Sequence, residues 1–390
     1  TEHVVTLNGL FSDTLYYYAI GNSTGQLIGD SSHFFHTSPV TGSDNPVRFW
    51  VLGDCGTANA NAAAVRDAYF GYAGSNYTNG ILMLGDNAYN TGTDAEYQAA
   101  VFDMYDDLLK QSVLWPTPGN HDYGSGADAQ TETGPYYDIF TLPRQAEAGG
   151  IASNTEAYYS FDVGNVHVIS LDSHDSDRSP GGPMLTWLTN DLAATLQDWI
   201  IVIFHHPAYT KGSHDSDSNS DSGGRMVEMR ENVLPILEDY DVDLVLSGHS
   251  HSFERSFLID GHYGHSSTFD STMVVNGGDG QEDGDGAYIK DVAVGLGSVY
   301  ITAGSSGKIS GGPLNHPVMY YSANTLGSVS VEVDGDQMDI KFISSTGTIS
   351  DHLTILHESY LGAPPTVQLT SPVDDIWFAA PQVVTITASA

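Results

Sequence analysis

The sequence has a single cysteine and no long apolar run, and each of these shortages excludes a structural feature. Cys55 has no second cysteine with which to form a disulfide inside the chain, although many bacterial secreted proteins also lack disulfides. The longest apolar runs, such as residues 199–204, have the length of a strand. A membrane-spanning helix needs about 20 apolar residues, so we expect no membrane span.

Basic residues are also scarce, because 12 Lys and Arg stand against 49 Asp and Glu, giving a formal net charge of -37. Such a surface repels nucleic acids and anionic membranes, so neither is expected as a partner. Most of the acids are Asp in Gly- and Ser-rich loops, which suits salty or calcium-bearing surroundings where ions screen the repulsion. An anionic substrate would need a local cationic centre, which buried metal ions would supply.

The 390 residues divide into three parts by their patterns. Residues 1–39 alternate like β-strands but are too few for a complete sandwich, so they indicate the last strands of one. Residues 46–357 alternate strand-like and helix-like runs, which is typical of an α/β fold, and return to a β pattern after about residue 268. Residues 363–390 resemble a linker and the opening strands of a further β domain. Since the sequence starts and stops within a pattern, we expect a mature or trimmed fragment.

The predicted helices of the middle part cover residues 61–72, 94–109, 183–196 and 227–238. Between them, five apolar runs of strand length end in polar residues, at the edge where α/β proteins place active sites. These polar residues are Asp54, Asp86, Tyr89, Asn120, His205, His249 and His251. An isolated Gly-Asp or His-x-His is usually a turn or a surface pair, but five such segments together predict one metal site.

The donor types divide into two groups that share Asp86, whose two carboxylate oxygens can bridge two cations. Asp54, Asp86, Tyr89 and one histidine carry three negative charges, which would balance a trivalent ion, and the hard phenolate favours ferric iron. Asp86, neutral Asn120 and two histidines suit a divalent ion. The sequence therefore predicts Fe³⁺ paired with Fe²⁺, Zn²⁺ or Mn²⁺.

Two further histidines fit the cleavage of a small-molecule phosphate ester. His121 follows Asn120 and can face the substrate, and His214 lies in a polar loop after His205, from which it could act as a donor or general acid. A metal-bound hydroxide would attack phosphorus, while the cations and histidines neutralise charge on the transferring group.

Five segments resemble, in order, the motif blocks of the calcineurin-like metallophosphoesterases. They are Gly53-Asp54-Cys55-Gly56, Gly85-Asp86-Asn87-Ala88-Tyr89, Gly119-Asn120-His121-Asp122, His205-His206-Pro207 and Gly248-His249-Ser250-His251. Within this superfamily the pattern resembles the purple acid phosphatases, since Cys55-Gly56 stands where most members have a histidine two residues after the aspartate, and Tyr89 replaces that histidine. The segment 252–255, Ser-Phe-Glu-Arg, is also similar to that family.

The resemblance assigns every proposed ligand to an ion. It implies a ferric site of Asp54, Asp86, Tyr89 and His251, and a divalent site of Asp86, Asn120, His205 and His249. It further implies that His121 binds substrate phosphate and that His214 is the second substrate histidine. His206 adjoins a ligand and is interpreted as a supporting residue, and Cys55 as a small residue that fills a tight turn.

The resemblance also implies the architecture, an α/β fold of two packed β-sheets with helices outside. Residues 1–39 would be the end of a fibronectin-like sandwich that precedes the catalytic domain in plant-type members. Residues 46–357 would form the catalytic domain, and residues 363–390 resemble bacterial Ig-like repeats of secreted proteins. We therefore expect a bacterial protein that is secreted or periplasmic.

The preferred function is a metal-dependent phosphomonoesterase, with two alternatives left open. One is a phosphodiesterase or nucleotidase on the same centre. The other is a calcium-dependent adhesion or surface protein with a vestigial phosphatase domain, suggested by the acidic loops 217–221 and 279–286. The first loop has spacing like that of an EF-hand, but Ser222 stands at the turn position that requires Gly, so a solvated loop is preferred over a Ca²⁺ site. The natural substrate and the oligomeric state stay open.

Overall fold

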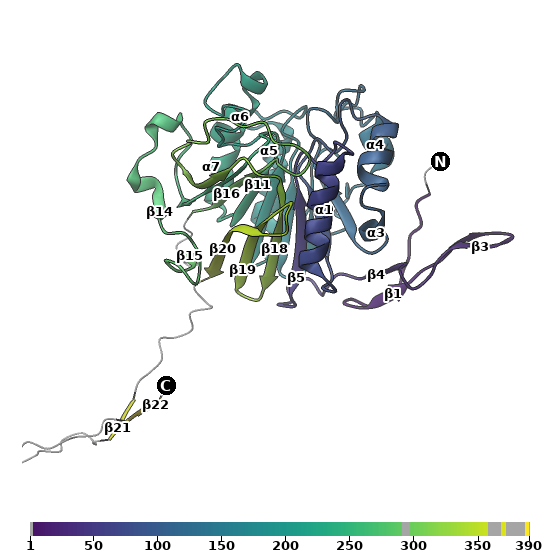
Figure 1. The fold of residues 1–390 in the computed structure, drawn as a ribbon, viewed down its shortest axis with the longest axis horizontal. Helices are drawn as coiled ribbons and strands as arrows, with labels where there is room; N and C mark the ends of the chain where they lie inside the picture. The colour runs from purple at the N-terminus through teal and green to yellow at the C-terminus, as the bar shows by residue number, and fades with distance from the viewer. Residues whose placement is uncertain (1–2, 291–296, 358–367, 372–386, 390) are drawn as a thin grey trace, which may run out of the picture.

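A computed structural model of the chain describes residues 3–290, 297–357, 368–371 and 387–389. Two seven-stranded sheets form its body (Figure 1). In spatial order the first sheet comprises β15 (Tyr288–Lys290), β20 (Ile349–His357), β19 (Gln337–Ser344), β18 (Gly327–Asp334), β5 (Val47–Leu52), β6 (Gly80–Met83) and β7 (Val113–Pro116). The second comprises β17 (Met319–Ala323), β12 (Phe253–Ser256), β16 (Val299–Ala303), β11 (Leu244–Ser247), β10 (Trp199–Phe204), β9 (Val166–Ser170) and β8 (Tyr159–Val163).

Both sheets are mixed, and each has a parallel part that ends at the same edge of the molecule. In the first sheet β5, β6 and β7 run parallel, and β18 pairs antiparallel with β5. In the second sheet β9, β10, β11 and β16 run parallel, and β8 and β12 are antiparallel to their neighbours. The predicted α/β fold of two packed sheets is therefore confirmed.

Aromatic stacking across the interface joins the two sheets into one core. Trp115 of β7 stacks on Phe161 of β8, and Phe253 of β12 stacks on Phe342 of β19, each with ring centroids 3.9 Å apart. Arg255 of β12 adds two hydrogen bonds of 2.6 and 2.8 Å to the carboxylate of one residue of β20, Asp351. Large aromatic side chains contribute much of the buried apolar area that stabilises such an interface.

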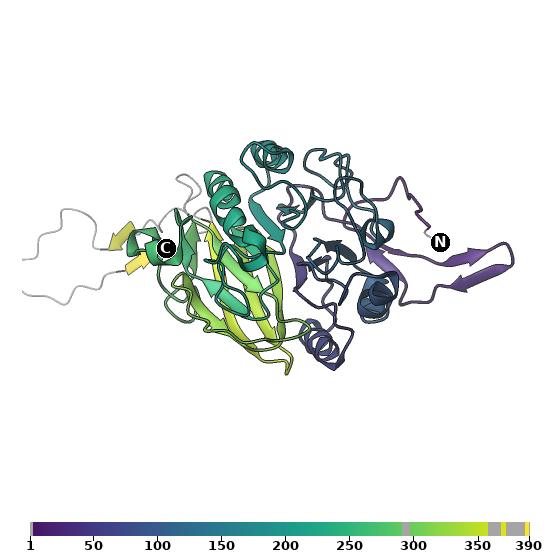
Figure 2. The same cartoon turned by 90° about the horizontal axis from the view of Figure 1, so that it is seen from above.

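Helices cover the outer faces of both sheets (Figure 2). On the first sheet, α1 (Ala60–Ala73) begins at Asn59, whose side chain accepts from two backbone amides of the first turn, and Tyr69 of α1 stacks on Trp50 at 4.4 Å. On the second sheet, Leu188 of α5 (Pro183–Ala194) and Leu237 of α7 (Leu234–Asp239) are buried in one apolar cluster with Val202 of β10. The predictions of helices at 61–72 and 183–196 are confirmed to within two residues at each end.

The other helical segments are short. The predicted helix at 94–109 is wrong as a single element, because the chain forms α2 (Asp94–Tyr97), a π-helical turn η1 (Gln98–Phe102) and α3 (Asp106–Leu109). Around the helix predicted at 227–238, the chain forms α6 (Arg225–Glu228), the π-helical η3 (Met229–Val233) and α7. The remaining helical elements are α4 (Pro135–Ile139), η2 (Asp221–Gly224), η4 (Ser266–Thr268) and η5 (Ser271–Met273).

Four small two-stranded sheets complete the described elements. They pair β1 (Leu15–Tyr17) with β4 (Phe34–His36), β2 (Ile20–Asn22) with β3 (Gly25–Ile28), β13 (Leu258–Ile259) with β14 (Val274–Asn276), and β21 (Gln368–Ser371) with β22 (Thr387–Ser389). The N-terminal strands are mostly exposed, and the Tyr18 phenol anchors them by donating to the Lys110 carbonyl at 2.9 Å.

The interpretation of residues 1–39 as the end of a fibronectin-like sandwich stays a prediction. Apart from the backbone of β21 and β22, the predicted linker and Ig-like strands at 363–390 lie outside the described residues. Within the described parts of the chain, no helix has both the length and the apolar character that crossing a membrane requires.

Candidate metal centre

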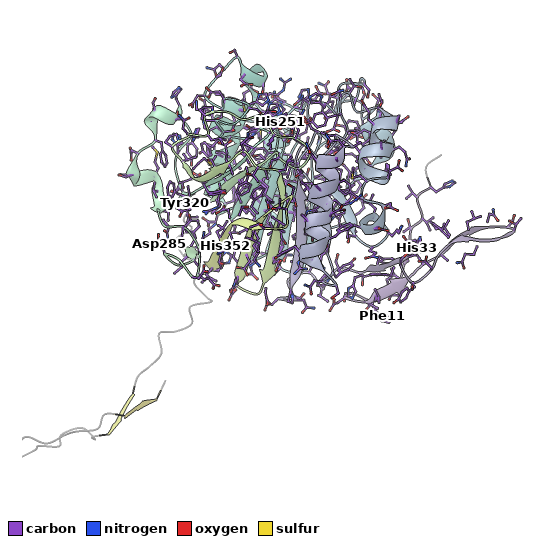
Figure 3. The ribbon with its side chains drawn as sticks, viewed as in Figure 1. Phe11, His33, His251, Asp285, Tyr320 and His352 are labelled. Carbon is purple, nitrogen blue, oxygen red and sulfur yellow. The ribbon has the colours of Figure 1, made fainter. Side chains whose placement is uncertain are left out.

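The seven candidate ligands converge at the edge where the parallel strands of both sheets end (Figure 3 labels His251 there). Asp54, Asp86 and Asn120 follow β5, β6 and β7 of the first sheet, and Tyr89 lies three residues beyond Asp86. The three histidines come from the second sheet, His205 directly after β10, and His249 and His251 after β11. Parallel strands of packed sheets present their carboxyl ends together, which is why residues far apart in the sequence meet here.

Tyr89 is the centre of one group of donors. Its phenol oxygen lies 2.8 Å from Asp86 Oδ2 and 2.9 Å from Asp54 Oδ1, and it donates its single hydrogen to these two carboxylates. His251 Nε2 lies 3.4 Å from the same phenol oxygen and 3.4 Å from Asp54 Oδ1. Asp54, Asp86, Tyr89 and His251 therefore surround one point, and they are the four residues that the resemblance places on the ferric ion.

The second group of donors surrounds His205. Its Nε2 lies 3.4 Å from Asp86 Oδ1, 3.1 Å from Asn120 Oδ1 and 3.1 Å from His249 Nδ1. Asp86 thus faces the first group with Oδ2 and the second with Oδ1. A carboxylate that turns a different oxygen to each of two donor groups has the geometry of a bridge between two cations.

Backbone and hydroxyl groups hold the histidines in the required orientation. His205 Nδ1 donates to the Leu84 carbonyl at 2.9 Å, so its Nε2 carries the free lone pair and faces the centre. His251 Nδ1 lies 2.8 Å from the Ser310 hydroxyl, which turns Nε2 of that ring inward as well. The side chains are preset for coordination, because each ring is fixed through the nitrogen that points away from the cluster.

The backbone at the site adopts conformations that ordinary residues avoid. Asp54, Asp86 and His249 have φ angles of 55°, 54° and 66°, in the left-handed region. Gly119 and Gly248 permit close approach to the carboxylates, since a Cβ would lie 2.2 Å from the Asp86 nitrogen at the first and 2.6 Å from Asp54 Oδ2 at the second. Strain of this kind persists where the surrounding structure holds it, and it is common at functional sites.

The electrostatics of the cluster favour a bound cation. Burial raises the pKa of Tyr89 well above its usual value, and the charges of Asp54 and Asp86 raise it further. Burial would also raise the pKa of Asp54, but the hydrogen bond from His251 and the charge of His205 outweigh that cost and lower it. Two buried carboxylates and a phenol at one point repel one another when ionised, and a metal ion removes that repulsion. The donor set therefore fits the metal site that the fold implies.

The two predicted substrate histidines lie at the rim of the cluster. His121 Nε2 is 3.9 Å from Asp86 Oδ2, and its Nδ1 is held by the Asn90 carbonyl at 2.6 Å. His214 stacks on the ring of His249 with centroids 3.9 Å apart, and its Nδ1 lies 2.8 Å from Asp221 Oδ1. Both side chains are partly exposed, as a residue that contacts substrate must be.

His206 and Cys55 have the surroundings expected of supporting residues. His206 is buried, and its Nδ1 lies 2.9 Å from the Ser173 hydroxyl, although its ring also approaches that of His249 to 4.4 Å. Cys55 is fully buried, and burial raises the pKa of its thiol to about 12. The thiol therefore stays neutral near pH 7, which agrees with a space-filling role.

Two residues at the site were given no role there by the sequence. Asp122 is buried and accepts from the amides of Gly119 at 2.7 Å and Asn87 at 3.1 Å, so it holds two of the motif loops together. Its place inside the third motif block was an available signal. Ser222 lies 2.6 Å from His249 Nε2, and its sequence context, an acidic Ser-rich loop, gave no indication of that contact.

The acidic loop 214–222 is tied to neighbouring groups. Asp217 pairs with Lys211 Nζ at 2.8 Å and accepts from the Ser266 amide at 2.8 Å, while Asp221 holds His214. The interpretation of a solvated loop is therefore wrong for Asp217, whose side chain is only 4% exposed and is held by protein partners.

Comparisons with known proteins cover the part of the chain that carries the candidate ligands. The profile of a family described as calcineurin-like phosphoesterase matches residues 47–253. Purple acid phosphatase 22 of Arabidopsis thaliana is 29% identical over 262 residues, covering 65% of this chain and 53% of the relative. Purple acid phosphatase 1 of Ipomoea batatas is 28% identical over 268 residues, covering 65% and 51%. The chain thus spans about half the length of these curated relatives.

Among solved structures, a purple acid phosphatase from yellow lupin (Lupinus luteus) seeds is similar in fold, with a TM-score of 0.65 at 16% identity. The alignment covers 93% of this chain and 64% of the lupin protein.

Proposed function

Since this chain belongs to the calcineurin-like phosphoesterase family, we propose that it is a dinuclear metal-dependent phosphatase that hydrolyses phosphate monoesters. The two oxygens of Asp86 carry this proposal, because Oδ2 faces Tyr89 and Oδ1 faces His205. The names of the curated relatives, purple acid phosphatases among them, support a phosphatase activity.

Each ion would have its own set of residues. Asp54, Asp86, Tyr89 and His251 would hold Fe³⁺, and the other donors of the cluster would hold Fe²⁺, Zn²⁺ or Mn²⁺ together with Asp86. Bound there, the ions would supply Lewis acidity and an activated water nucleophile. The phenol favours iron at the first position, since a phenolate is a hard ligand suited to a trivalent cation.

The protein's own groups would bind and orient the phosphate ester. His121 is placed by its backbone amide, which donates to Asp86 Oδ1 at 2.9 Å, and by the Asn90 carbonyl, which accepts from Nδ1. In the imidazolium form, Nε2–H of this ring is free to donate to a phosphoryl oxygen. Asp221 accepts from Nδ1 of His214, so in the imidazolium form of this ring Nε2–H is free to transfer a proton to the leaving group.

A visible spectrum combined with metal analysis tests the assignment of the ions. We expect a tyrosinate-to-ferric charge-transfer band that Tyr89→Phe abolishes while the fold is retained. A colourless protein that holds only zinc or manganese would contradict the iron assignment and leave the phosphoesterase proposal standing.

Rates on an aryl monophosphate, a bis-aryl phosphate and nucleotides test the reaction. We expect the monophosphate to be the best of the three. Preference for the diester or for nucleotides would favour the phosphodiesterase or nucleotidase alternative. Absence of all activity in metal-replete protein would overturn the proposal and favour an adhesion or surface role. Secretion and a bacterial origin stay predictions.

A further inference from the structure

Lys308 differs from every other cationic side chain in the protein. All 12 Lys and Arg residues lie in the described part of the chain, and the others contact at least one carboxylate or backbone carbonyl. In the same described residues Lys308 has neither kind of partner. Because the other Lys and Arg side chains are paired, Lys308 is the one among the described residues whose charge is available to an anionic ligand.

The ammonium of Lys308 lies at the candidate metal centre. Its Nζ is 3.9 Å from the centroid of the Tyr89 ring, whose phenol oxygen contacts both Asp54 and Asp86. The His121 ring contacts the same tyrosine ring with centroids 4.5 Å apart. Lys308 therefore lies one aromatic ring away from the shared carboxylate, beside a histidine that we assign to phosphate binding.

The loop that carries Lys308 is fixed on both sides to the loops that carry metal ligands. Before it, the Ser306 amide donates to the Gly53 carbonyl, adjacent to Asp54, at 3.1 Å. After it, the Ser310 amide donates to the His251 carbonyl at 3.2 Å. These two anchors hold residue 308 at the rim of the site, so the lysine is part of a built structure, and the side chain remains partly exposed to solvent.

We propose that Lys308 is a specificity residue that favours dianionic phosphate monoesters over monoanionic phosphodiesters, an inference that rests on the proposed function. A phosphate monoester carries close to two negative charges at pH 7, because its second pKa is about 6, whereas a diester carries one. The Coulomb attraction between an ammonium and the substrate scales with that charge. The lysine therefore stabilises the bound monoester more than the bound diester.

A purely structural lysine would behave differently. The contact with the Tyr89 ring is a cation–π interaction, which contributes a small stabilisation. Its loss would lower stability, or disturb Tyr89, and would reduce the hydrolysis of both substrate classes alike. Only a contact with the substrate changes the ratio between them.

The test compares Lys308→Met with Lys308→Arg in metal-replete protein of verified metal content. For Lys308→Met we expect kcat/KM to fall about tenfold on an aryl monophosphate and about threefold on a bis-aryl phosphate, because half the charge gives half the Coulomb energy and therefore the square root of the fold-change. Lys308→Arg retains the charge and should keep most of the selectivity. The monoester KM of the wild type should also rise more steeply with ionic strength than that of Lys308→Met.

Lys341→Met is the matched control. Lys341 also lies over a tyrosine ring, at 5.9 Å from the centroid of Tyr72, and pairs with Glu332, but it is on β19 beside α1 rather than at the site. The ratio of the two kcat/KM values should be unchanged in this variant. An equal loss on both substrates in Lys308→Met, or no loss on either, would overturn the inference.

Binding of inorganic phosphate, measured by calorimetry on the metal-replete protein, separates this inference from the proposed function. We expect phosphate to bind about tenfold more weakly to Lys308→Met than to the wild type, and unchanged to Lys341→Met. A wild type that binds phosphate through Lys308 but cleaves no ester would contradict the proposed function alone. Equal phosphate affinity in Lys308→Met and the wild type would refute the role of Lys308.

Discussion

The two sheets contribute different chemistry to the same edge. All the oxygen donors come from the first sheet, with Asp54 after β5, Asp86 and Tyr89 after β6, and Asn120 after β7. All the nitrogen donors come from β10 and β11 of the second sheet. Neither sheet could complete a site of mixed donors by itself, so coordination depends on the packing of one against the other.

The two contributions also differ in charge. The carboxylates of the first sheet are buried acids that need a cation, whereas burial lowers the pKa of His249 well below its usual value, as do the neighbouring histidines. A neutral imidazole has the free lone pair that a metal ion needs. The first sheet thus supplies the negative charge of the candidate site. Among the histidines of the second sheet, His249 is favoured in its neutral form, whereas Asp86 and Asp54 raise the pKa of His205 against the effect of its burial.

Removing the shared ligand should have the largest effect. In Asp86→Ala we expect loss of both metals and a fall in the proposed phosphatase activity of more than about 10³-fold, because in the proposed site both ions would share that carboxylate. The measurement is metal content by mass spectrometry together with the rate on an aryl monophosphate. His249→Ala, which removes a nitrogen donor of the second sheet, should keep the iron and lose the divalent ion. If Asp86→Ala kept one metal at full occupancy, the proposal that Asp86 bridges both ions would be contradicted.

Weakening the contact between the sheets should have the next largest effect. Phe342 is buried and stacks on Phe253 across the interface at 3.9 Å. We expect Phe342→Ala to lower the free energy of unfolding by about 3–5 kcal/mol, from lost burial and the cavity that remains. Denaturant unfolding curves of the variant and the wild type measure this loss of unfolding free energy. Leu196→Ala, at a side chain 94% exposed, is the control and should change stability by less than about 0.5 kcal/mol.

One histidine of the second sheet should affect stability instead of coordination. His167 of β9 is buried with its two ring nitrogens 2.7 Å from Asp162 and 3.0 Å from Asp191. Burial alone would lower its pKa, but the two carboxylates raise it from 6.5 to about 9. The charged form is therefore favoured in the folded state.

The stabilisation from His167 should be fully present below pH 6.5 and lost as the pH rises through about 9. The shift in pKa corresponds to roughly 3 kcal/mol of unfolding free energy. Unfolding curves of the wild type and His167→Gln between pH 6 and 10 measure it, since only the wild type should lose this increment. Parallel pH profiles of the two proteins would show that the ring is not charged in the folded state.

The smallest effect should come from the N-terminal strands, which contact the end of the first sheet that carries β7. Tyr18→Phe removes the hydrogen bond to the Lys110 carbonyl and should cost about 1 kcal/mol of unfolding free energy. The shift in the denaturation midpoint measures it. Tyr17→Phe, at a residue 65% exposed, is the control. No difference between the two variants would show that this anchor does not couple the strands to the first sheet.

Much of the α/β pattern was predictable because local signals were strong. The apolar runs before Asp54 and Asp86 are strands, and the helix predicted at 61–72 begins one residue early, at Ala60. The helix predicted at 94–109 is interrupted at Tyr105, which has non-helical backbone angles. The buried Tyr105 ring packs on Trp50 with ring centroids 5.4 Å apart. A distant aromatic partner therefore overrides the local helical period.

In the candidate site, too, some features were predictable from local signals and others depended on distant contacts. The residue types and their order along the chain pointed to Asp86 and Tyr89 before any geometry was known. The approach of Lys308 to Tyr89 was not predictable, since it depends on hydrogen bonds from Ser306 and Ser310 to loops more than fifty residues earlier in the chain.

The sequence by itself predicted the candidate donor set and its division by charge, and it indicated the family, because residue types and motif order are read directly from the chain. Only the tertiary structure decided which oxygen of Asp86 faces which group, and which cation lacks an anionic partner. Both depend on how the two sheets pack face to face, and packing is a property of residues that the sequence keeps far apart.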